Sequence, residues 1–257
     1  MSLEAFLEKA VEAARAAEEV IRHYYHGEFD VERKADASPV TVADIESERA
    51  IKGVLSKAFP GHGFYGEELG RETPDAEYVW LIDPIDGTKS FVRGYPFFST
   101  QIALMHRGEL ICGVSNAPMF GRGELACAAA GMGATLNGEP IRVSEVDDLA
   151  DATLSMGNIA TLAGSSRWQA LGDLIRRVHR IRGYGDFYHY HLLASGRIDL
   201  IVESDLNILD IAALTVILRE AGGRITDLEG GPIDLDTTSV FAGNGRVDAA
   251  AREILFG

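Results

Sequence analysis

A short apolar segment that runs directly into two acidic residues places the strongest constraint on how this chain folds. The residues are LIDPIDGT at positions 81–88, in which Asp83 and Asp86 stand three apart. Tyr78–Ile82 has the composition of a buried strand, and carboxylates at the end of such a strand can point into one crevice. Because hard cations such as Mg²⁺ prefer oxygen ligands, this arrangement predicts a metal site at the end of the strand.

The residues that follow the two carboxylates suit an anion. Gly87 permits a close approach of the backbone, and Thr88 opens a following segment whose first N–H groups lack helical partners. The start of such a segment is well suited to bind phosphate. Taken alone, the stretch is equally typical of a polar turn in which the aspartates cap and Pro84 stiffens the chain. The choice between the two interpretations therefore depends on the other acidic residues.

Two further acidic residues stand in informative surroundings. Glu67 follows the glycine-rich turn Gly61–Gly63, where a glutamate is normally solvated. Asp210 lies near the start of the otherwise apolar stretch Ile208–Leu218, and a carboxylate there is costly unless it is paired or bound to a metal. Capping of the helix is the alternative explanation for Asp210.

The order of apolar patterns predicts an α/β fold of the layered α+β type with two sub-domains, residues 1–145 and 146–257. In the first half we expect helices at 3–25 and from the cap Thr41 to just before Pro60, and strands at 78–82, 99–104, 110–115, 124–130 and 134–136. In the second half we expect strands at 152–156, 197–202 and 224–226, and helices at 167–178, 209–221 and 246–255.

Charge and composition exclude several classes of partner. The 257 residues carry a formal charge of −15, from 24 basic and 39 acidic residues, so a nucleic-acid partner is not expected. No apolar run is long enough to cross a bilayer, and Glu4, Glu8 and Glu12 interrupt the segment that a secretory signal would need. Cys112 and Cys127 are too few for a disulfide framework and indicate a cytoplasmic protein in which both thiols lie in the core.

Together, these motifs resemble those of the inositol monophosphatase superfamily. The resemblance rests on GEE at 66–68, DPIDGT at 83–88, Asp210 ahead of two alanines, and AGG at 221–223, which occur in the order of the family. No single motif is specific, but the set is. The similarity extends from about Lys34 to Gly245.

The resemblance implies an alternating α/β/α/β/α sandwich and a lithium-sensitive phosphomonoesterase. Such an enzyme would use two or three Mg²⁺ ions, act on a small-molecule phosphate ester and form a homodimer. By position in this sequence, the metal ligands would be Glu67, Asp83, Asp86, Asp210 and the main-chain carbonyl of Ile85.

The same resemblance implies roles for the residues around the metal ligands. Thr88, backed by Asp44, would help to orient the attacking water together with Glu67. Gly87 and Thr88 would donate backbone N–H groups to the phosphate. Lys34 corresponds to a basic residue on a loop near the metal site.

Residues near these motifs favour histidinol phosphate as the substrate. Inositol-specific members usually read DGTTNF, whereas this chain reads DGTKSF at 86–91, with Lys89 at the divergent position, which is similar to the histidinol-phosphate phosphatases of the family. Asp186 and Glu203 are the acidic residues expected to contact the amine and imidazole of this substrate. For Asp186, capping of the following helix is the alternative explanation.

Two other functions stay open at this point. The same chemistry could act on inositol 1-phosphate, a sugar phosphate or a nucleotide-derived phosphate, and Leu209 departs from the aromatic residue that the family usually has beside the pocket. The third possibility is a catalytically silent regulatory protein with the same fold. The complete set of acidic residues argues against that third possibility.

Overall fold

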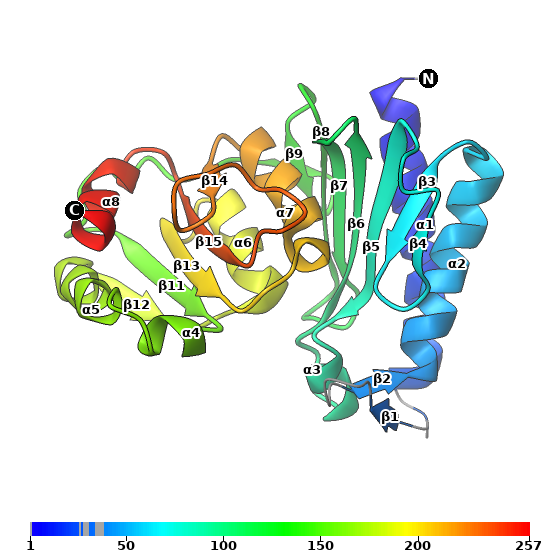
Figure 1. The fold of residues 1–257 in the computed structure, drawn as a ribbon, viewed down its shortest axis with the longest axis horizontal. Helices are drawn as coiled ribbons and strands as arrows, with labels where there is room; N and C mark the ends of the chain where they lie inside the picture. The colour runs from blue at the N-terminus through cyan, green and yellow to red at the C-terminus, as the bar shows by residue number, and fades with distance from the viewer. Residues whose placement is uncertain (1, 26, 28–30, 34–38) are drawn as a thin grey trace.

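The computed structural model describes residues 2–25, 27, 31–33 and 39–257, and Figure 1 shows the helices and strands that they form. The helices are α1 (Leu3–Tyr25), α2 (Val42–Ala58), α3 (Thr88–Val92), α4 (Ala160–Ala163), α5 (Trp168–Arg177), α6 (Asp186–Ala194), α7 (Ile208–Glu220) and α8 (Asp248–Phe256). The strands are β1 (Val31–Arg33), β2 (Pro39–Thr41), β3 (Gly63–Gly66), β4 (Gly70–Glu72), β5 (Tyr78–Asp86), β6 (Ser99–His106), β7 (Glu109–Ala117), β8 (Glu124–Ala129), β9 (Ala134–Leu136), β10 (Glu139–Ile141), β11 (Thr153–Gly157), β12 (Arg180–Arg182), β13 (Leu200–Ser204), β14 (Arg224–Thr226) and β15 (Ser239–Gly243).

Two sheets dominate the described part of the chain. An eight-stranded sheet has the order β10-β9-β8-β7-β6-β5-β3-β4, and in it β3 runs parallel to β5 while the other neighbours are antiparallel. A five-stranded sheet has the order β12-β11-β13-β15-β14 and combines parallel with antiparallel pairs. β1 and β2 form a separate small hairpin. The predicted boundary near residue 145 falls between β10 and β11, and the division into sub-domains stays a prediction.

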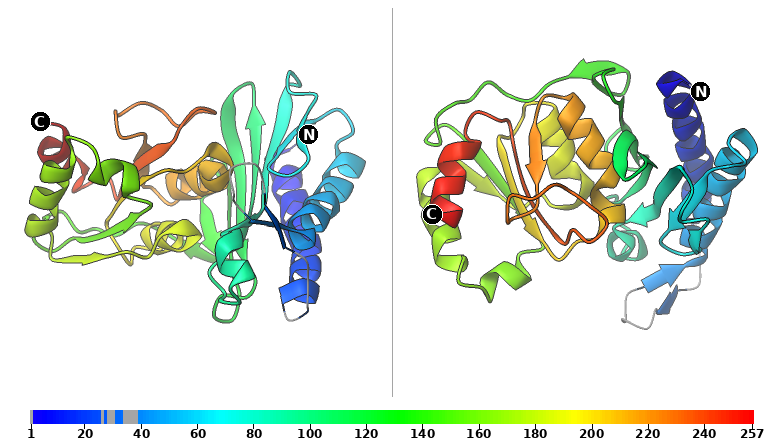
Figure 2. Two further views of the ribbon diagram at one scale, coloured as in Figure 1. Left: turned by 60° about the horizontal axis from the view of Figure 1, so that its bottom comes forward. Right: turned by 45° about the horizontal axis from the view of Figure 1, so that its top comes forward.

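Helices separate and cover the two sheets. α1 and α2 lie on the outer face of the eight-stranded sheet, α6 and α7 lie between the sheets, and α5 and α8 lie beyond the five-stranded sheet (Figures 1 and 2). The C-terminal helix is therefore at the opposite end of the molecule from α1 (Figure 2). The predicted α/β/α/β/α sandwich is confirmed.

Alternation of side chains along each strand explains why the layers stack. In β5, Val79 and Leu81 face the core shared with α7, whereas Trp80 and Ile82 face the core under α1 and α2. In β13, Ile201 faces α7 and its neighbours face α5 and α8. Because the strands are apolar on both faces, each sheet requires a cover on both sides.

Most of the predicted elements are present, but one strand is shorter than expected and several short elements were not predicted. The strand expected at 197–202 begins at Leu200, because Gly196, with φ of +70°, ends α6 in a turn that the N–H of Arg197 closes onto Leu192. The elements that were not predicted are all short: the strands β1, β2, β3, β4, β10, β12 and β15 and the helices α3 and α4. Among the described residues, no helix is both long enough and apolar enough to span a membrane.

Small residues allow α7 to approach the eight-stranded sheet closely. α7 packs across β6, β7 and β8, where Ala103, Ala126 and Ala128 belong to the same core as the helix. A Cβ atom at Gly113 would lie 2.4 Å from the carbonyl oxygen of Ala213 in α7, so no larger residue fits there without movement. Since α7 carries Asp210, this packing also sets the distance between that carboxylate and β5.

We predict that Gly113→Ala destabilises the protein by about 1–3 kcal/mol, because the added methyl group forces α7 away from β7. Gly53→Ala is the matched control, since a Cβ at this position in α2 would meet nothing within 4 Å. The control is expected to be neutral or to stabilise by up to about 1 kcal/mol, as is usual for glycine to alanine within a helix. Urea unfolding of both variants measures the difference, and equal stabilities would contradict the close packing of α7.

Candidate active site

A β-bulge brings the two carboxylates of β5 to one side of the sheet. Asp83 pairs with Gln101 and Asp86 pairs with Ser99, so three residues on β5 oppose two on β6 and the register shifts between them. In a regular strand, residues three apart would face opposite sides. The bulge removes this alternation, and the backbone N–H of Ile85 donates to Asp83 Oδ1 at 3.0 Å across the bend.

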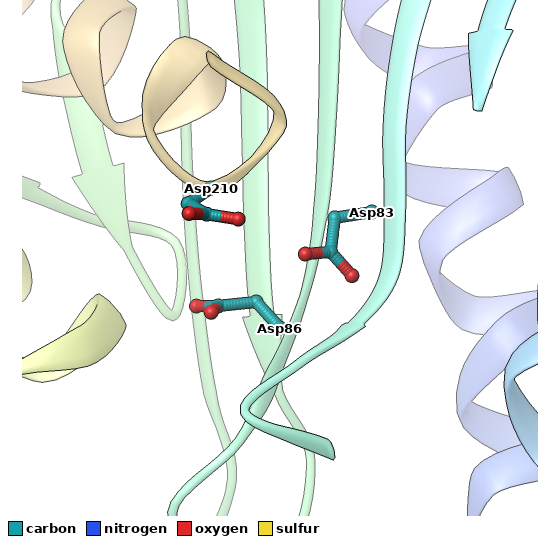
Figure 3. A group of neighbouring side chains, drawn as sticks. All are labelled: Asp83, Asp86 and Asp210. Atoms are coloured by element: carbon teal, nitrogen blue, oxygen red, sulfur yellow. The ribbon is translucent and has the colours of Figure 1, made fainter. Parts of the chain in front are cut away.

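The third carboxylate comes from the first turn of α7. Asn207 caps the helix, and Asp210 completes a capping box by accepting a hydrogen bond from the backbone N–H of Asn207 at 2.8 Å. The N-cap is therefore Asn207, and Asp210 is the third residue of the helix, which caps by accepting from the N-cap backbone. In the same conformation Asp210 points toward Asp83 and Asp86, as Figure 3 shows. Oxygen atoms of the three side chains lie within 4.8 Å of one another.

Burial and mutual repulsion oppose ionisation of this acidic cluster, by which we mean Asp83, Asp86 and Asp210. Burial raises the pKa of Asp83 well above its usual value, and the charges of Glu67, Asp86 and Asp210 raise it further. Burial also raises the pKa of Asp86, and it raises the pKa of Asp210 to about 7. Only a bound cation would allow all three carboxylates to be ionised together at low cost.

Thr88 lies between β5 and α2. Its hydroxyl lies 3.0 Å from the carbonyl oxygen of Ile85 and 3.2 Å from Asp44 Oδ1. Asp44 is buried, which raises its pKa, and its second oxygen accepts hydrogen bonds from the backbone and hydroxyl of Thr41. The predicted contact of Thr88 with Asp44 is thus present. Because the only hydroxyl hydrogen of Thr88 is used on these acceptors, the oxygen can accept a further hydrogen bond.

A cavity of about 310 Å³ adjoins these residues. Its lining consists of Glu67, Gly87, Thr88, Lys89, Ser90, Tyr95, Asn158 and Asp186. Gly87 has φ of +92°, and a Cβ there would lie 2.8 Å from the carbonyl oxygen of Phe97, so glycine is required at this turn. The cavity therefore brings Glu67 from one predicted motif, and Gly87 and Thr88 from another, together with Asp186.

Comparison with known proteins identifies the family. The model of the inositol monophosphatase family matches residues 2–255. The chain belongs to the inositol monophosphatase family.

Relatives in this family carry two kinds of name. The chain is 38% identical over 226 residues to a histidinol-phosphatase of Mycobacterium tuberculosis, covering 86% of each chain. It is 36% identical over 233 residues to an inositol-1-monophosphatase of Rhizobium meliloti, covering 88% of this chain and 86% of that protein. The structure of an inositol monophosphatase from Anabaena superposes with a TM-score of 0.86 at 31% identity, covering 99% of this chain and 96% of the other. The chain is a phosphomonoesterase, and identity alone does not select its substrate.

Within this family member, Asp186 lies beside the cavity in a strained conformation. α6 begins at Asp186 after the N-cap Gly185, which makes no side-chain capping bond, so the capping interpretation of Asp186 is wrong. Asp186 has φ of +45°, and so does Asn158, which lines the same cavity. Left-handed backbone in non-glycine residues costs free energy and often marks functional sites. Burial, followed by the charge of Glu203, raises the pKa of Asp186 to about 6.

Glu203 lies deeper than Asp186 and already has partners. Its Oε2 accepts a hydrogen bond from the hydroxyl of Tyr190 at 2.8 Å and lies 3.1 Å from Nε2 of His189. A Cβ at Gly157 would lie 2.2 Å from its Oε1. The predicted role of Glu203 as a substrate contact stays a prediction. The contacts of Glu203 with His189 and Tyr190 were not predicted, because these residues lie 14 and 13 positions before it and no local pattern indicates such a contact. Lys34, the other predicted contact, lies outside the described residues.

The acidic cluster fits a divalent metal ion. Carboxylates from two elements converge within the reach of one ion, and burial makes them costly without one. Asp83, Asp86 and Asp210 are the residues that would hold the ion. Glu67 is close enough for its charge to raise the pKa of Asp83. Which of these groups bind metal stays a prediction.

We predict that Mg²⁺ raises the melting temperature by about 5–10 °C at saturation, because the ion binds only the folded arrangement of carboxylates. Without metal, the pKa of Asp210 is about 7 in the folded protein and has its ordinary value of 3.8 in the unfolded chain. Between these two pH values, the folded protein keeps a proton that the unfolded chain has lost. Its free energy of unfolding should therefore fall as pH rises through this window. Thermal melts at pH 5.5 and 7.5, with EDTA or with Mg²⁺, measure both effects.

The matched variants for this experiment are Asp210→Asn and Asp236→Asn, of which the second alters an exposed loop carboxylate. The first should weaken both the pH dependence and the response to Mg²⁺, and the second should change neither. Identical behaviour of the two variants would contradict the electrostatic description of the cluster.

Proposed function

We propose that this enzyme is a magnesium-dependent phosphatase that hydrolyses histidinol phosphate to histidinol and phosphate. The observation that carries the choice of substrate is the position of Asp186 in the wall of the cavity that also contains Thr88 and Glu67. A phosphate ester that carries a cationic amine suits this cavity better than a neutral polyol does, because the amine would offset the charges that raise the pKa of Asp186.

The cavity also offers an aromatic surface to the imidazole of this substrate. Tyr95 lines the cavity and is 45% exposed, so its ring is accessible to a planar group. Lys89 lines the cavity as well, and its charge opposes the rise in the pKa of Asp186. The cavity therefore combines a carboxylate, an aromatic ring and an ammonium group around the position of the ester.

In the proposed reaction, Thr88 and Asp44 prepare the attacking water. The hydroxyl of Thr88 points its hydrogen toward Asp44 or Ile85, so its oxygen can accept a hydrogen bond from the water and orient a water lone pair toward phosphorus. Asp44, whose pKa is raised by burial, is the acceptor behind this hydroxyl. Glu67 holds the water from the other side of the cavity, and the N–H groups of Gly87 and Thr88 bind the phosphate oxygens.

Magnesium, held by Asp83, Asp86, Asp210, Glu67 and the carbonyl of Ile85, would supply the positive charge that offsets the phosphate and makes water a stronger nucleophile. Without that charge, the acidic cluster would repel a phosphate dianion. The enzyme should therefore lose activity in EDTA and regain it when Mg²⁺ is returned. No covalent intermediate with the protein is required.

We predict that the enzyme prefers histidinol phosphate over inositol 1-phosphate, and that Asp186→Asn removes the preference. Loss of a charge-assisted contact costs roughly 1.5–3 kcal/mol, so kcat/KM for histidinol phosphate should fall by about 10–100-fold. The value for inositol 1-phosphate should change by less than about 3-fold, because the polyol has no cation to lose. Phosphate release from both esters, measured with Mg²⁺, provides the comparison.

Two controls make this result specific. Asp173→Asn removes a carboxylate on α5 that pairs with Arg176 and does not line the cavity, and it should leave the hydrolysis of both substrates unaffected. Asp86→Asn should abolish hydrolysis of both. Better turnover of inositol 1-phosphate by the unaltered enzyme would keep the phosphatase chemistry and reject the substrate proposed here.

A further inference from the structure

Glu48 is a fully buried carboxylate that no part of the proposed mechanism uses. It lies on α2, one helical turn after Asp44, and its relative exposure is 0%. Its Oε2 accepts a hydrogen bond from the backbone N–H of Glu68 at 2.7 Å, and its two oxygens lie 3.2 and 3.3 Å from the N–H of Leu69. Glutamates are rarely buried completely, and these bonds are the reason that this one can be.

The segment that Glu48 holds is the turn of the β3–β4 hairpin, residues 67–69. The N–H of Glu67, the first residue of this turn, donates to the carbonyl oxygen of Ile82 in β5 at 3.1 Å. The next two N–H groups donate to Glu48. The backbone of the turn is therefore tied on one side to β5, directly before Asp83, and on the other side to α2.

The fit between Glu48 and the hairpin leaves no room for a side chain. A Cβ at Gly66 would lie 1.6 Å from Glu48 Oε1 and 2.4 Å from its carboxyl carbon. Gly66 is paired with Ile82 in the sheet and has no left-handed φ, so alanine would suit its backbone. Glycine is required at position 66 because only a residue without a Cβ leaves space for the carboxylate of Glu48.

α2 thus reaches two groups of the site through carboxylates that stand four residues apart on one face. Asp44 accepts from the hydroxyl of Thr88, and Glu48 accepts from the turn that begins with Glu67. Keeping Glu48 ionised costs stability, because burial raises its pKa to about 7 in spite of these bonds and the nearby charge of Lys52.

We propose that Glu48 is a positioning residue that fixes the backbone of the Glu67 turn and thereby sets the affinity of the acidic cluster for its metal ion. The inference rests on the proposed role of Glu67 at the metal site. Glu48 does not touch the cluster, so it acts only through residues 66–69. Groups that orient metal ligands from outside typically alter metal affinity by about 10–100-fold when they are removed.

The first test uses Glu48→Gln, which preserves size but replaces one acceptor oxygen with an amide donor facing backbone N–H groups. Without metal, amide hydrogen exchange in a peptide that contains residues 67–69 should become at least about 10-fold faster. The Kd for Mg²⁺, measured by calorimetry, should rise by about 10-fold. At saturating Mg²⁺, kcat should stay within about 3-fold of the unaltered enzyme, because the reacting groups are all retained.

The matched control is Glu46→Gln on the same helix. Glu46 instead accepts a hydrogen bond from the hydroxyl of Tyr24 in α1 at 2.9 Å. This variant should change neither the exchange of residues 67–69 nor the Kd for Mg²⁺. Equal effects of the two substitutions, or an unchanged Kd in Glu48→Gln, would overturn the proposal.

A second pair of variants keeps the proposal testable if Glu48→Gln folds poorly. Gly66→Ala alone should raise the Kd for Mg²⁺, because the methyl group displaces the carboxylate of Glu48. In a Glu48→Ala background the same substitution should have a smaller effect, since the colliding carboxylate is gone. Independent, multiplicative effects would show that Gly66 and Glu48 do not act as one unit, which would overturn the proposal.

These readouts separate the inference from the proposed function. If the unaltered protein fails to hydrolyse phosphate esters with Mg²⁺, the proposed function fails, while exchange and Mg²⁺ affinity still decide the role of Glu48. If hydrolysis is found but neither readout moves in Glu48→Gln, the proposed function stands and the role of Glu48 is rejected.

Discussion

The repulsion among three neighbouring carboxylates, of which Asp83 is buried and Asp86 and Asp210 are partly buried, is the constraint on which the active site depends. Asp83 and Asp86 come from the end of β5, and Asp210 comes from α7, so the repulsion acts across the packing between a sheet and a helix. Small residues such as Gly113 hold that helix close to the sheet. The free energy gained by burying the apolar core under α7 thus offsets the repulsion between the carboxylates. A bound cation would relieve this repulsion, and the relief would add to the affinity for the cation.

The bulge in β5 is the local device that makes this arrangement possible. Asp83 stands two residues after Leu81 in β5, so it lies on the same face of the strand, which packs against α7. Asp86 would face α2 if the strand continued without interruption, and the two carboxylates could not share an ion. The bulge between Asp83 and Asp86 adds one residue to β5 relative to β6, so Asp86 faces the same side of the sheet as Asp83. At the same bend, the carbonyl of Ile85 accepts a hydrogen bond from the hydroxyl of Thr88.

The sequence predicted what is encoded locally and missed what depends on distant partners. Asp83, Asp86 and Thr88 lie in one motif, and the layered fold followed from the resemblance. The short apolar strand Ser239–Gly243 lacks an alternating pattern, so it was missed. Glu48 was missed because its partners lie about 20 residues away, and nothing beside it in α2 marks it. The capping box at Asn207 was readable but was not recognised.

Capping and the proposed roles in catalysis are compatible explanations for the acidic residues at helix starts. Asp44 and Asp210 both occupy the third position of a capping box, after Thr41 and Asn207. In each case one oxygen bonds the N-cap backbone. The other oxygen of Asp44 accepts from the hydroxyl of Thr88, and the other oxygen of Asp210 accepts from the side-chain amide of Asn207 at 2.9 Å, while the carboxylate of Asp210 points toward the acidic cluster. The local bond fixes the side-chain rotamer, and a fixed rotamer is what positioning requires. A helix start that is stable by itself therefore delivers a preorganised carboxylate, which explains why the capping signals and the proposed catalytic residues coincide.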